Sequence, residues 1–267
     1  MPVADPRSNG LRAFYEENGY LLIRGLIPRD EIEQIRDRFE QIWREGQEGY
    51  LWRDDSGEVV NHCEKYPRIV HPHRFDALSR QYLLDPRITD VVRELLDDEP
   101  LAAQTMYYWK PPGTKGQALH QDNLYLQAES GEGCMAAWLA IDRATEENGC
   151  IRVVPGSHRL ELQCPEEADA ERFQFLNYVP PPEGFTEVAC VMEPGDCLFF
   201  GGHTIHGSDP NRSATDSRRS LICHYIGTGS KECAGFYNPL LAMDGREVIA
   251  ESPTMGSPCG VSFDGPH

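Results

Sequence analysis

The sequence predicts an α+β fold in which helices near the N-terminus flank a β-barrel or a double-sheet jelly roll. Residues 8–98 contain stretches with apolar side chains at helical spacing, whereas short β-prone runs separated by turn signals follow from about residue 102. Helices first and many short strands later are typical of one α+β domain. No internal repeat and no linker divides the 267 residues, so a single domain over residues 1–267 is expected.

The sequence pattern of residues 8–47 predicts a helix, a strand and a second helix. Gly19 is placed to end the first helix, and the apolar stretch "YLLIRGLI" that follows is β-prone. The second helix opens at Pro28 and carries apolar residues at helical spacing, namely Ile32, Ile35, Phe39 and Ile42. Residues 75–98 predict further helix interrupted near Pro86, and these helices are expected to cover the outside of a sheet.

The later part of the chain predicts six short strands. Turn signals such as "PPGTKG", "EENG" and "EPGD" separate them. The runs are "AAQTMYYW" (102–109), "CMAAWLAI" (134–141), "CIRVV" (150–154), "TEVACVM" (186–192), "CLFFGG" (197–202) and "RSLICHYI" (219–226).

The formal charge of −18, with a pI near 4.8, argues against a nucleic-acid or anionic-membrane partner. No run of about eighteen apolar residues is present, so no membrane-spanning helix is expected. The first residues lack the basic start and apolar run of a secretory signal. The charge is therefore interpreted as a solvated acidic surface, although a cationic substrate would also be attracted to it.

The nine cysteines are odd in number and include no Cys-x-x-Cys pair. Five of them fall in apolar stretches, which predicts buried free thiols in a reducing cytoplasm. These are Cys134, Cys150, Cys190, Cys197 and Cys223.

A possible metal site begins in "ALHQDNLY" (118–125), where His120 and Asp122 would project from the same face if this stretch is a strand. A third ligand could come from His203 or His206 in "PGDCLFFGGHTIHGSDPN" (194–211). These two histidines would face opposite ways along a continuing strand, so only one can join the metal, and the other would be structural. Two histidines and a carboxylate suit an Fe(II) ion that activates oxygen, although a zinc hydrolase is also possible.

Several motifs, in order, resemble those of the phytanoyl-CoA dioxygenase family of Fe(II)- and 2-oxoglutarate-dependent oxygenases. They are "FYEENGYLLIRGLI" (14–27), "HQD" (120–122), "AAWLAIDRATEENGCIRVVPGSH" (136–158), "PGDCLFF" (194–200), "HGSDPN" (206–211) and "RRSLICHY" (218–225). The resemblance covers most of residues 8–226. It implies a double-stranded β-helix, which is a cupin-like jelly-roll barrel, with the N-terminal helices at its flank.

The resemblance also implies roles for individual residues. His120, Asp122 and His206 would bind Fe(II), because the family's second histidine directly precedes Gly-Ser. An arginine about a dozen residues later would hold the distal carboxylate of 2-oxoglutarate, a group that a guanidinium fork fits well. The hydroxyl of Ser208 would join it. Trp138 stands where the family has an aromatic residue beside the co-substrate, unless it is simply core.

Tyr108 is a further candidate for the wall beside the co-substrate. The arginine itself is either Arg218 or Arg219. In a strand over "SRRSLICHYI" (217–226), alternate residues face opposite ways. Arg218 shares a face with the more polar set and is expected inside the barrel, whereas Arg219 should reach solvent. The family alignment also favours Arg218.

Other polar residues are assigned less specific places. His158 is expected in a loop, and His224 either buried and paired or near the site. The stretch 60–75, with His62, His71 and His73, is expected to be a turn-rich segment and a candidate substrate lid. Gln104 is a candidate substrate contact from its strand position alone.

The function implied is oxidation of a C–H bond with Fe(II), 2-oxoglutarate and O2, releasing succinate and CO2. Hydroxylation is the expected outcome, while desaturation, epimerisation and ketone formation remain open. The acidic surface favours a small polar molecule, such as an amine-bearing natural-product intermediate, over a long acyl chain. The alternatives are a catalytically silent binding protein of the same fold and a divalent-metal hydrolase. The sequence gives no oligomeric state.

Overall fold

The computed structural model describes residues 10–45, 68–129, 133–175, 177–253 and 258–260. Their main feature is a large antiparallel sheet in the order β1-β10-β5-β12-β3-β13-β14, with β2 also paired to β3. The strands of this sheet are β1 (Tyr20–Ile23), β2 (Arg68–Val70), β3 (Pro100–Tyr108), β5 (Cys134–Ala140), β10 (Cys197–Gly201), β12 (Ser220–Gly227), β13 (Leu240–Leu241) and β14 (Glu247–Val248).

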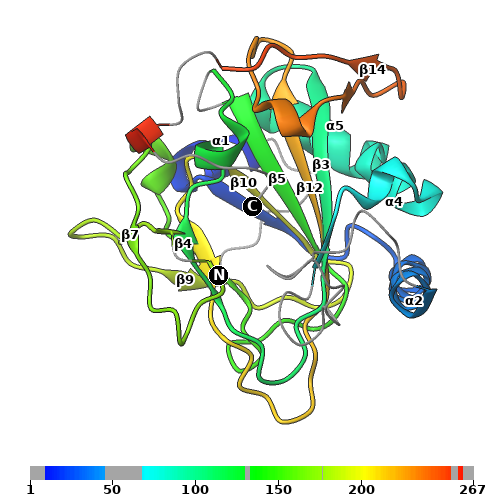
Figure 1. Cartoon of the computed structure of the whole chain (residues 1–267), viewed down its shortest axis with the longest axis vertical. Helices are drawn as coiled ribbons and strands as arrows, with labels where there is room; N and C mark the ends of the chain where they lie inside the picture. The colour runs from blue at the N-terminus through cyan, green and yellow to red at the C-terminus, as the bar shows by residue number, and fades with distance from the viewer. Residues whose placement is uncertain (1–9, 46–67, 130–132, 176, 254–257, 261–267) are drawn as a thin grey trace, which may run out of the picture.

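Helices cover one face of this sheet (Figure 1). They are α1 (Leu11–Asn18), α2 (Arg29–Glu45), α4 (Ala77–Leu83) and α5 (Pro86–Leu96). The helix α1 ends at Gly19, whose positive φ of 77° lets its N–H bond to the carbonyl of Tyr15, as predicted. Asp85 caps α5 and Pro86 begins it, which explains the predicted interruption. The apolar face of α2 joins one core cluster with the outward side chains of β12, Leu221 and Tyr225 among them, and its Phe39 stacks on Tyr107 of β3 with 3.8 Å between ring centroids.

A second antiparallel sheet faces the other side of the large sheet, in the order β4-β11-β6-β9. Its strands are β4 (Gln117–His120), β6 (Ile151–Val153), β9 (Val188–Ala189) and β11 (His206–Ser208). The core between the sheets includes Met106, Trp138 and Ile222 from the large sheet and Ile151 and Val153 from the small one. This agrees with the predicted α+β class and double-sheet architecture, although no described strand pair joins the two sheets into a closed barrel.

All six predicted strands are present, but several strands of only two to four residues were missed. These include β2, β13 and β14, and also the small pair β7 (Glu166–Glu167) and β8 (Asn177–Tyr178), whereas β4 and β11 lie in stretches that were considered as strands only conditionally. A run this short has too few residues for alternation to show, so its pairing depends on distant partners. The remaining elements are the short helix α6 (Asn123–Leu126) and single 3-10 turns, η1 (Pro72–Arg74), η3 (Ser157–Arg159), η4 (Gly235–Tyr237) and η5 (Pro258–Gly260).

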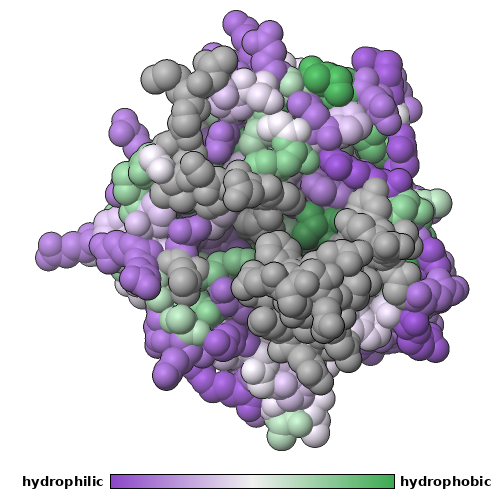
Figure 2. All heavy atoms as spheres, viewed as in Figure 1, coloured by the Kyte–Doolittle hydropathy of each residue, from purple (hydrophilic) through white to green (hydrophobic). Residues whose placement is uncertain are grey.

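The surface is mainly hydrophilic on the face shown in Figure 2, as the net charge predicts. Among the described residues, Val191 and Ile249 are the large apolar side chains that are exposed. No helix within the described ranges is both long and apolar enough to span a bilayer.

The five cysteines predicted to be buried free thiols are buried and free. Cys164 and Cys259, however, form a disulfide, so the prediction of free thiols does not hold for them. Both lie in exposed segments and are 95 residues apart in sequence, so no local pattern could reveal the pair.

Candidate functional site

His120 ends β4, and Asp122 lies two residues later at the start of α6. The prediction that both side chains project from one face of a strand is therefore wrong in detail. The backbone turns at Gln121 instead, whose buried side chain is anchored to the carbonyl of His203 at 2.8 Å and to the N–H of Gln163 at 2.7 Å. The turn still brings the imidazole and the carboxylate together.

His206 begins β11 and pairs directly with His120 on β4. The next residue, Gly207, allows this close approach, because a Cβ there would lie 2.8 Å from the carbonyl oxygen of Gln117. His203 lies in the turn before β11 and donates from Nδ1 to the carbonyl of Leu160 at 3.0 Å. The premise of one continuous strand through both histidines is thus wrong, yet His206 is the one beside His120.

His120, Asp122 and His206 form a compact group of three possible metal ligands, all buried, whose ligand atoms lie within 4.8 Å of one another. The Oδ1 atom of Asp122 lies 3.5 Å from Nε2 of each histidine. Both histidines donate from Nδ1 to backbone carbonyls, of Ala118 at 2.8 Å and Thr204 at 2.9 Å. Because a carbonyl can only accept, each Nε2 carries the lone pair, and that of His120 accepts a hydrogen bond from the side-chain amide of Gln117 at 3.1 Å, which a metal ion would replace.

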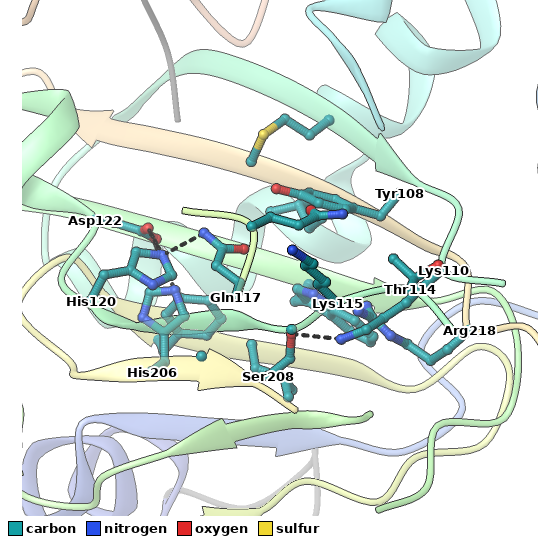
Figure 3. Close-up of a pocket in the computed structure, with 18 of the residues that line it drawn as sticks. Tyr108, Lys110, Thr114, Lys115, Gln117, His120, Asp122, His206, Ser208 and Arg218 are labelled. Atoms are coloured by element: carbon teal, nitrogen blue, oxygen red, sulfur yellow. Dashed lines mark hydrogen bonds and ion pairs between the residues drawn. The ribbon is translucent and has the colours of Figure 1, made fainter. Parts of the chain in front are cut away.

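One pocket contains these three residues at one end and two buried cationic side chains, Lys110 and Arg218, at the other (Figure 3). Arg218 precedes β12 on the inner side, and Ile222 and His224 from the same strand also line the pocket. Alternate residues Leu221 and Tyr225 belong to the core beneath the helices. The strand faces therefore match the predicted alternation.

Arg219 lies outside this pocket. Its guanidinium pairs with Asp142 at 2.7 Å and with Glu40 at 2.7 Å, and its side chain is 22% exposed. The expected free reach into solvent is therefore replaced by ion pairs with α2 and with the loop after β5.

Lys110 is the second cation of the pocket, and sequence reasoning missed it. It is 3% exposed, and its Nζ donates to the hydroxyl of Ser208 at 2.9 Å and to the carbonyl of Asp209. Burial lowers the pKa of Lys110 well below its ordinary range, and the nearby charge of Arg218 lowers it further. A lysine that is followed by two prolines reads as part of a surface turn, so no local signal reveals its burial.

Arg218 is also buried, at 4% exposure. It donates to the hydroxyl of Ser220 at 3.1 Å and stacks over the ring of Trp138 at 5.1 Å. Burial lowers the pKa of Arg218 to about 10, so it remains charged at neutral pH. Neither Arg218 nor Lys110 forms an ion pair with any residue that the structure describes.

The remaining predicted site residues also line this pocket. Ser208 faces Lys110, and Trp138 contributes both to the pocket wall and to the core between the sheets. Tyr108 lines the pocket and accepts a hydrogen bond at 3.2 Å from the guanidinium of Arg68. The structure thus brings all seven predicted site residues to one pocket.

Further histidines surround the site. His224 is buried and donates from Nε2 to Oδ2 of Asp122 at 3.2 Å. Gln104 is its strand partner on β3 but does not line the pocket. His158 bonds from Nε2 to the carbonyl of Glu16 at 3.1 Å, away from the metal ligands.

The histidine-rich stretch that was a candidate lid is only partly described. His62 lies outside the described residues. His71 and His73 are buried next to β3, and the ring of His73 bonds to the hydroxyl of Thr105 at 2.7 Å. These two histidines therefore belong to the interior.

Comparisons with known proteins agree with the motif pattern. The family model described as Phytanoyl-CoA dioxygenase (PhyH) matches residues 15–220. A probable phytanoyl-CoA dioxygenase of Caenorhabditis elegans is 30% identical over 230 residues, which are 80% of this chain and 73% of that protein. The peroxisomal phytanoyl-CoA dioxygenase of Homo sapiens is 30% identical over 226 residues, covering 80% and 67%.

The fold is shared with proteins of much lower sequence identity. The crystal structure of the epimerase SnoN in complex with Fe3+, alpha ketoglutarate and nogalamycin RO matches with a TM-score of 0.67 at 19% identity. The match covers 92% of this chain and 94% of that one. The extent of the family match and the identity to these relatives lead to one assignment: the chain belongs to the phytanoyl-CoA dioxygenase family.

Proposed function

We propose that this protein is an Fe(II)- and 2-oxoglutarate-dependent dioxygenase that oxidises a C–H bond of a small polar molecule. The observation that carries the proposal is the pairing of two features in one pocket. A compact His-Asp-His group lies at one end, and two buried cations without ion-pair partners among the described residues lie at the other. The family membership supports the same reading.

The donor set of His120, Asp122 and His206 fits Fe(II). Two neutral imidazole nitrogens and one carboxylate would occupy one side of the ion and leave further positions open to a co-substrate and to oxygen. The Nδ1 bonds to backbone carbonyls fix both rings before any metal arrives, so little order is lost on binding. The same set could hold zinc, which the experiment below distinguishes.

The opposite end of the pocket fits the distal carboxylate of 2-oxoglutarate. Lys110 and Arg218 supply two positive charges, and the hydroxyl of Ser208, which accepts a hydrogen bond from Lys110, lines the same pocket. Burying such charges without a partner costs free energy, which a bound dianion would offset. Trp138 and Tyr108 would form the wall along its carbon chain.

The iron and 2-oxoglutarate, when bound, would supply the oxygen activation that yields succinate, CO2 and an oxidised substrate. The residues of the chain perform the binding and shielding. Arg218 and Lys110 hold the co-substrate, His120 and His206 keep their tautomers, and apolar residues exclude water. Those apolar residues are Met106, Ile151, Phe200 and Ile222.

The proposal is tested by adding Fe(II) and 2-oxoglutarate without oxygen and recording the absorption spectrum. A charge-transfer band near the visible region is expected, and Zn(II) in its place should give none. Admission of oxygen should then release succinate. Absence of the band, together with hydrolase activity that zinc restores, would reject the proposal in favour of a metal hydrolase. Absence of both would indicate a silent binding protein.

A further inference from the structure

Three buried side chains near Asp122 have polar atoms that the fold does not satisfy. His71, Gln104 and Tyr237, which we call the neutral polar cluster, are 6%, 0% and 0% exposed. Within the described part of the chain, no hydrogen-bond partner is found for either ring nitrogen of His71, either amide atom of Gln104 or the hydroxyl of Tyr237. Each such buried atom costs about 1–3 kcal/mol, so the cluster is an unfavourable feature of the fold taken alone.

The cluster lies on the inner side of the large sheet, beyond the metal ligands. Gln104 on β3 pairs with His224 on β12, and His224 contacts Asp122 at 3.2 Å. His71 directly follows β2, and its N–H donates to the carbonyl of Thr105 at 2.8 Å. Cross-strand partners on one face have Cβ atoms about 5 Å apart, so Gln104 adjoins the residue that holds the Asp122 carboxylate.

Tyr237 in η4 closes the cluster from the C-terminal part of the chain. Its ring lies edge-on to the ring of His71, with 6.0 Å between centroids. His71 itself has φ 55° and ψ 38°, a left-handed backbone that is uncommon for a residue other than glycine. Strained residues of this kind persist where the surrounding structure holds them, often at ligand sites.

All three side chains are neutral near pH 7. Burial lowers the pKa of His71 well below its ordinary range, and Arg74, His73 and His224 lower it further. Burial raises the pKa of Tyr237 well above its ordinary range, and the charge of Asp122 adds to this. Neutral groups give no counter-charge, so a buried ammonium or carboxylate would be poorly held here. They do offer several donors and acceptors together.

We propose that His71, Gln104 and Tyr237 bind a neutral group of the primary substrate that both donates and accepts hydrogen bonds, such as a carboxamide or a pair of hydroxyls. This inference rests on the proposed oxygenase function, because it takes Asp122 as a metal ligand. It narrows the expected polar substrate, favouring a neutral group over an amine at this end of the site.

The test uses three probes of similar size: acetamide, acetate and methylammonium. Their binding to the full-length protein is measured by ligand-observed NMR, without added iron or 2-oxoglutarate. Acetamide should bind, and the binding that Gln104→Leu weakens should be at least fivefold weaker for acetate and methylammonium; acetate bound at the proposed carboxylate site of Lys110 and Arg218 is not affected by this variant. Binding of a charged probe that Gln104→Leu weakens as much as it weakens acetamide, or no binding of acetamide, would overturn the proposal.

Two variants then locate the bound acetamide. Gln104→Leu and Tyr237→Phe each remove hydrogen-bonding atoms while keeping most of the shape, and each should weaken acetamide binding about five- to tenfold. Tyr225→Phe is the matched control, since its hydroxyl donates to the carbonyl of Leu83 at 2.8 Å on the helix side of the same sheet. This control should leave acetamide binding unchanged.

Thermal unfolding separates a binding role from a structural one. Because the polar atoms of Gln104 and Tyr237 have no partner among the described residues, Gln104→Leu and Tyr237→Phe should keep or raise the Tm. Tyr225→Phe should lower it, because a formed hydrogen bond is lost. If the first two variants lower the Tm as much as the control and leave acetamide binding unchanged, the cluster is structural and the inference is wrong.

Failure of the neutral polar cluster as a binding site can be distinguished from failure of the proposed oxygenase function. Acetamide binding is measured without iron, whereas the charge-transfer band requires iron and 2-oxoglutarate but no substrate. The band without acetamide binding would reject only the neutral polar cluster as a subsite. Acetamide binding without the band would reject the oxygenase function on which the inference rests.

Discussion

Arg218 and Arg219 are adjacent in sequence, yet they lie on opposite faces of the large sheet in opposite electrostatic surroundings. Arg219 faces the helices and pairs with two carboxylates, from Asp142 and Glu40. Arg218 faces the second sheet, is more deeply buried, and has a serine hydroxyl and the ring of Trp138 as its contacts. The more buried arginine is thus the one without an anionic partner among the described residues.

Two individual neutral groups, one on each face, show a similar contrast. On the helix side, the hydroxyl of Tyr225 donates to the carbonyl of Leu83 at 2.8 Å. On the inner side, Gln104 has no hydrogen-bond partner in the described ranges, and Lys110 has only hydroxyl and carbonyl acceptors. The contrast holds for the buried charges, because the helix side also contains two unsatisfied neutral groups among the described residues, the hydroxyl of Tyr107 and the indole N–H of Trp109. The guanidinium on the helix side is paired with carboxylates, whereas the buried cations on the inner side lack an ion-pair partner in the described ranges, as the proposed co-substrate site requires.

Loss of a proposed metal ligand should give the largest effect on the inner face. Asp122→Ala and His206→Ala are each expected to weaken Fe(II) binding by more than about 100-fold, because losing a direct ligand exceeds the 10- to 100-fold typical of outer partners. Succinate release should be abolished. Calorimetry with Co(II) or Fe(II) under nitrogen measures the binding.

His203→Ala is the matched control for the metal, since His203 bonds to the carbonyl of Leu160 instead. It should retain most of the metal affinity and activity. If His203→Ala abolished metal binding while His206→Ala preserved it, the assignment of the third ligand would be reversed.

The two arginines provide the second test. Arg218→Ala should raise the 2-oxoglutarate concentration for half-maximal turnover about 100-fold, since losing one partner of a desolvated charge pair costs on the order of 3 kcal/mol. Arg219→Ala should change this value little. Instead it should lower the Tm, because Asp142 and Glu40 lose their cation.

The proposed difference between the two faces of the sheet would be wrong if Arg218→Ala and Arg219→Ala showed each other's expected effects. A large effect of Arg219→Ala on 2-oxoglutarate, with none for Arg218→Ala, would show that the inner cation serves the fold. Titration of 2-oxoglutarate and thermal unfolding on the same two preparations decide this.

Lys110 should give the third effect. Lys110→Met keeps the length of the side chain but removes its charge, and is expected to weaken 2-oxoglutarate binding roughly 10- to 100-fold, the value of one charge-assisted hydrogen bond. Lys115→Met is the control, because Lys115 also lines the pocket but its Nζ donates to the carbonyl of Ala170 at 2.7 Å. An equal loss of 2-oxoglutarate affinity in both variants would indicate that the overall positive charge of the pocket matters, rather than a specific contact of Lys110.

The pH dependence of binding tests Lys110 separately. Burial and the charge of Arg218 lower the pKa of Lys110 in the free protein, and a bound dianion should raise it again. The affinity for 2-oxoglutarate should therefore fall as the pH rises through the pKa that Lys110 has in the free protein. Above this pKa the free protein carries a neutral amine, which must take up a proton when the dianion binds. Lys110→Met should remove this slope, and a slope that persists would assign it to another group.

The periodicity of apolar residues in the sequence is sufficient to predict much of the fold. The four apolar residues of α2 and the alternation of β12 are local signals, and both match the structure. The same alternation predicts that Arg218 and Arg219 face opposite ways, and the structure has them so. Spacing alone left the third metal ligand open between His203 and His206. The family motif, in which the second histidine directly precedes Gly-Ser, selects His206.

The missed features all depend on distant parts of the chain. Lys110 is buried by Ser208 and by the carbonyls of Gly149 and Asp209. The turn at Gln121 that redirects Asp122 is held by loops around residues 161–163 and 203. No window of neighbouring residues contains such contacts, so sequence patterns could identify the residue types of the site but not their complete set.

Substitution of His224 should give the smallest effect on ligand binding of the changes proposed for the inner face. Its Nε2 donates to Oδ2 of Asp122 at 3.2 Å, which leaves Oδ1 directed toward both histidines. We expect His224→Ala to weaken metal binding about tenfold, since the carboxylate loses an orienting partner. The 2-oxoglutarate requirement should change little, because Arg218 and Lys110 lie at the other end of the pocket.

The conservative variant His224→Gln places an amide N–H near the position of Nε2 and should recover most of the metal affinity. Recovery by glutamine but not by alanine is the pattern of a positioning residue, because general loss of packing would affect both variants. Co(II) titration of the two proteins, with Tyr225→Phe as the control from the helix side of the same strand, measures this. Equal metal affinity in wild type and His224→Ala would show that Asp122 is oriented by the turn at Gln121 alone.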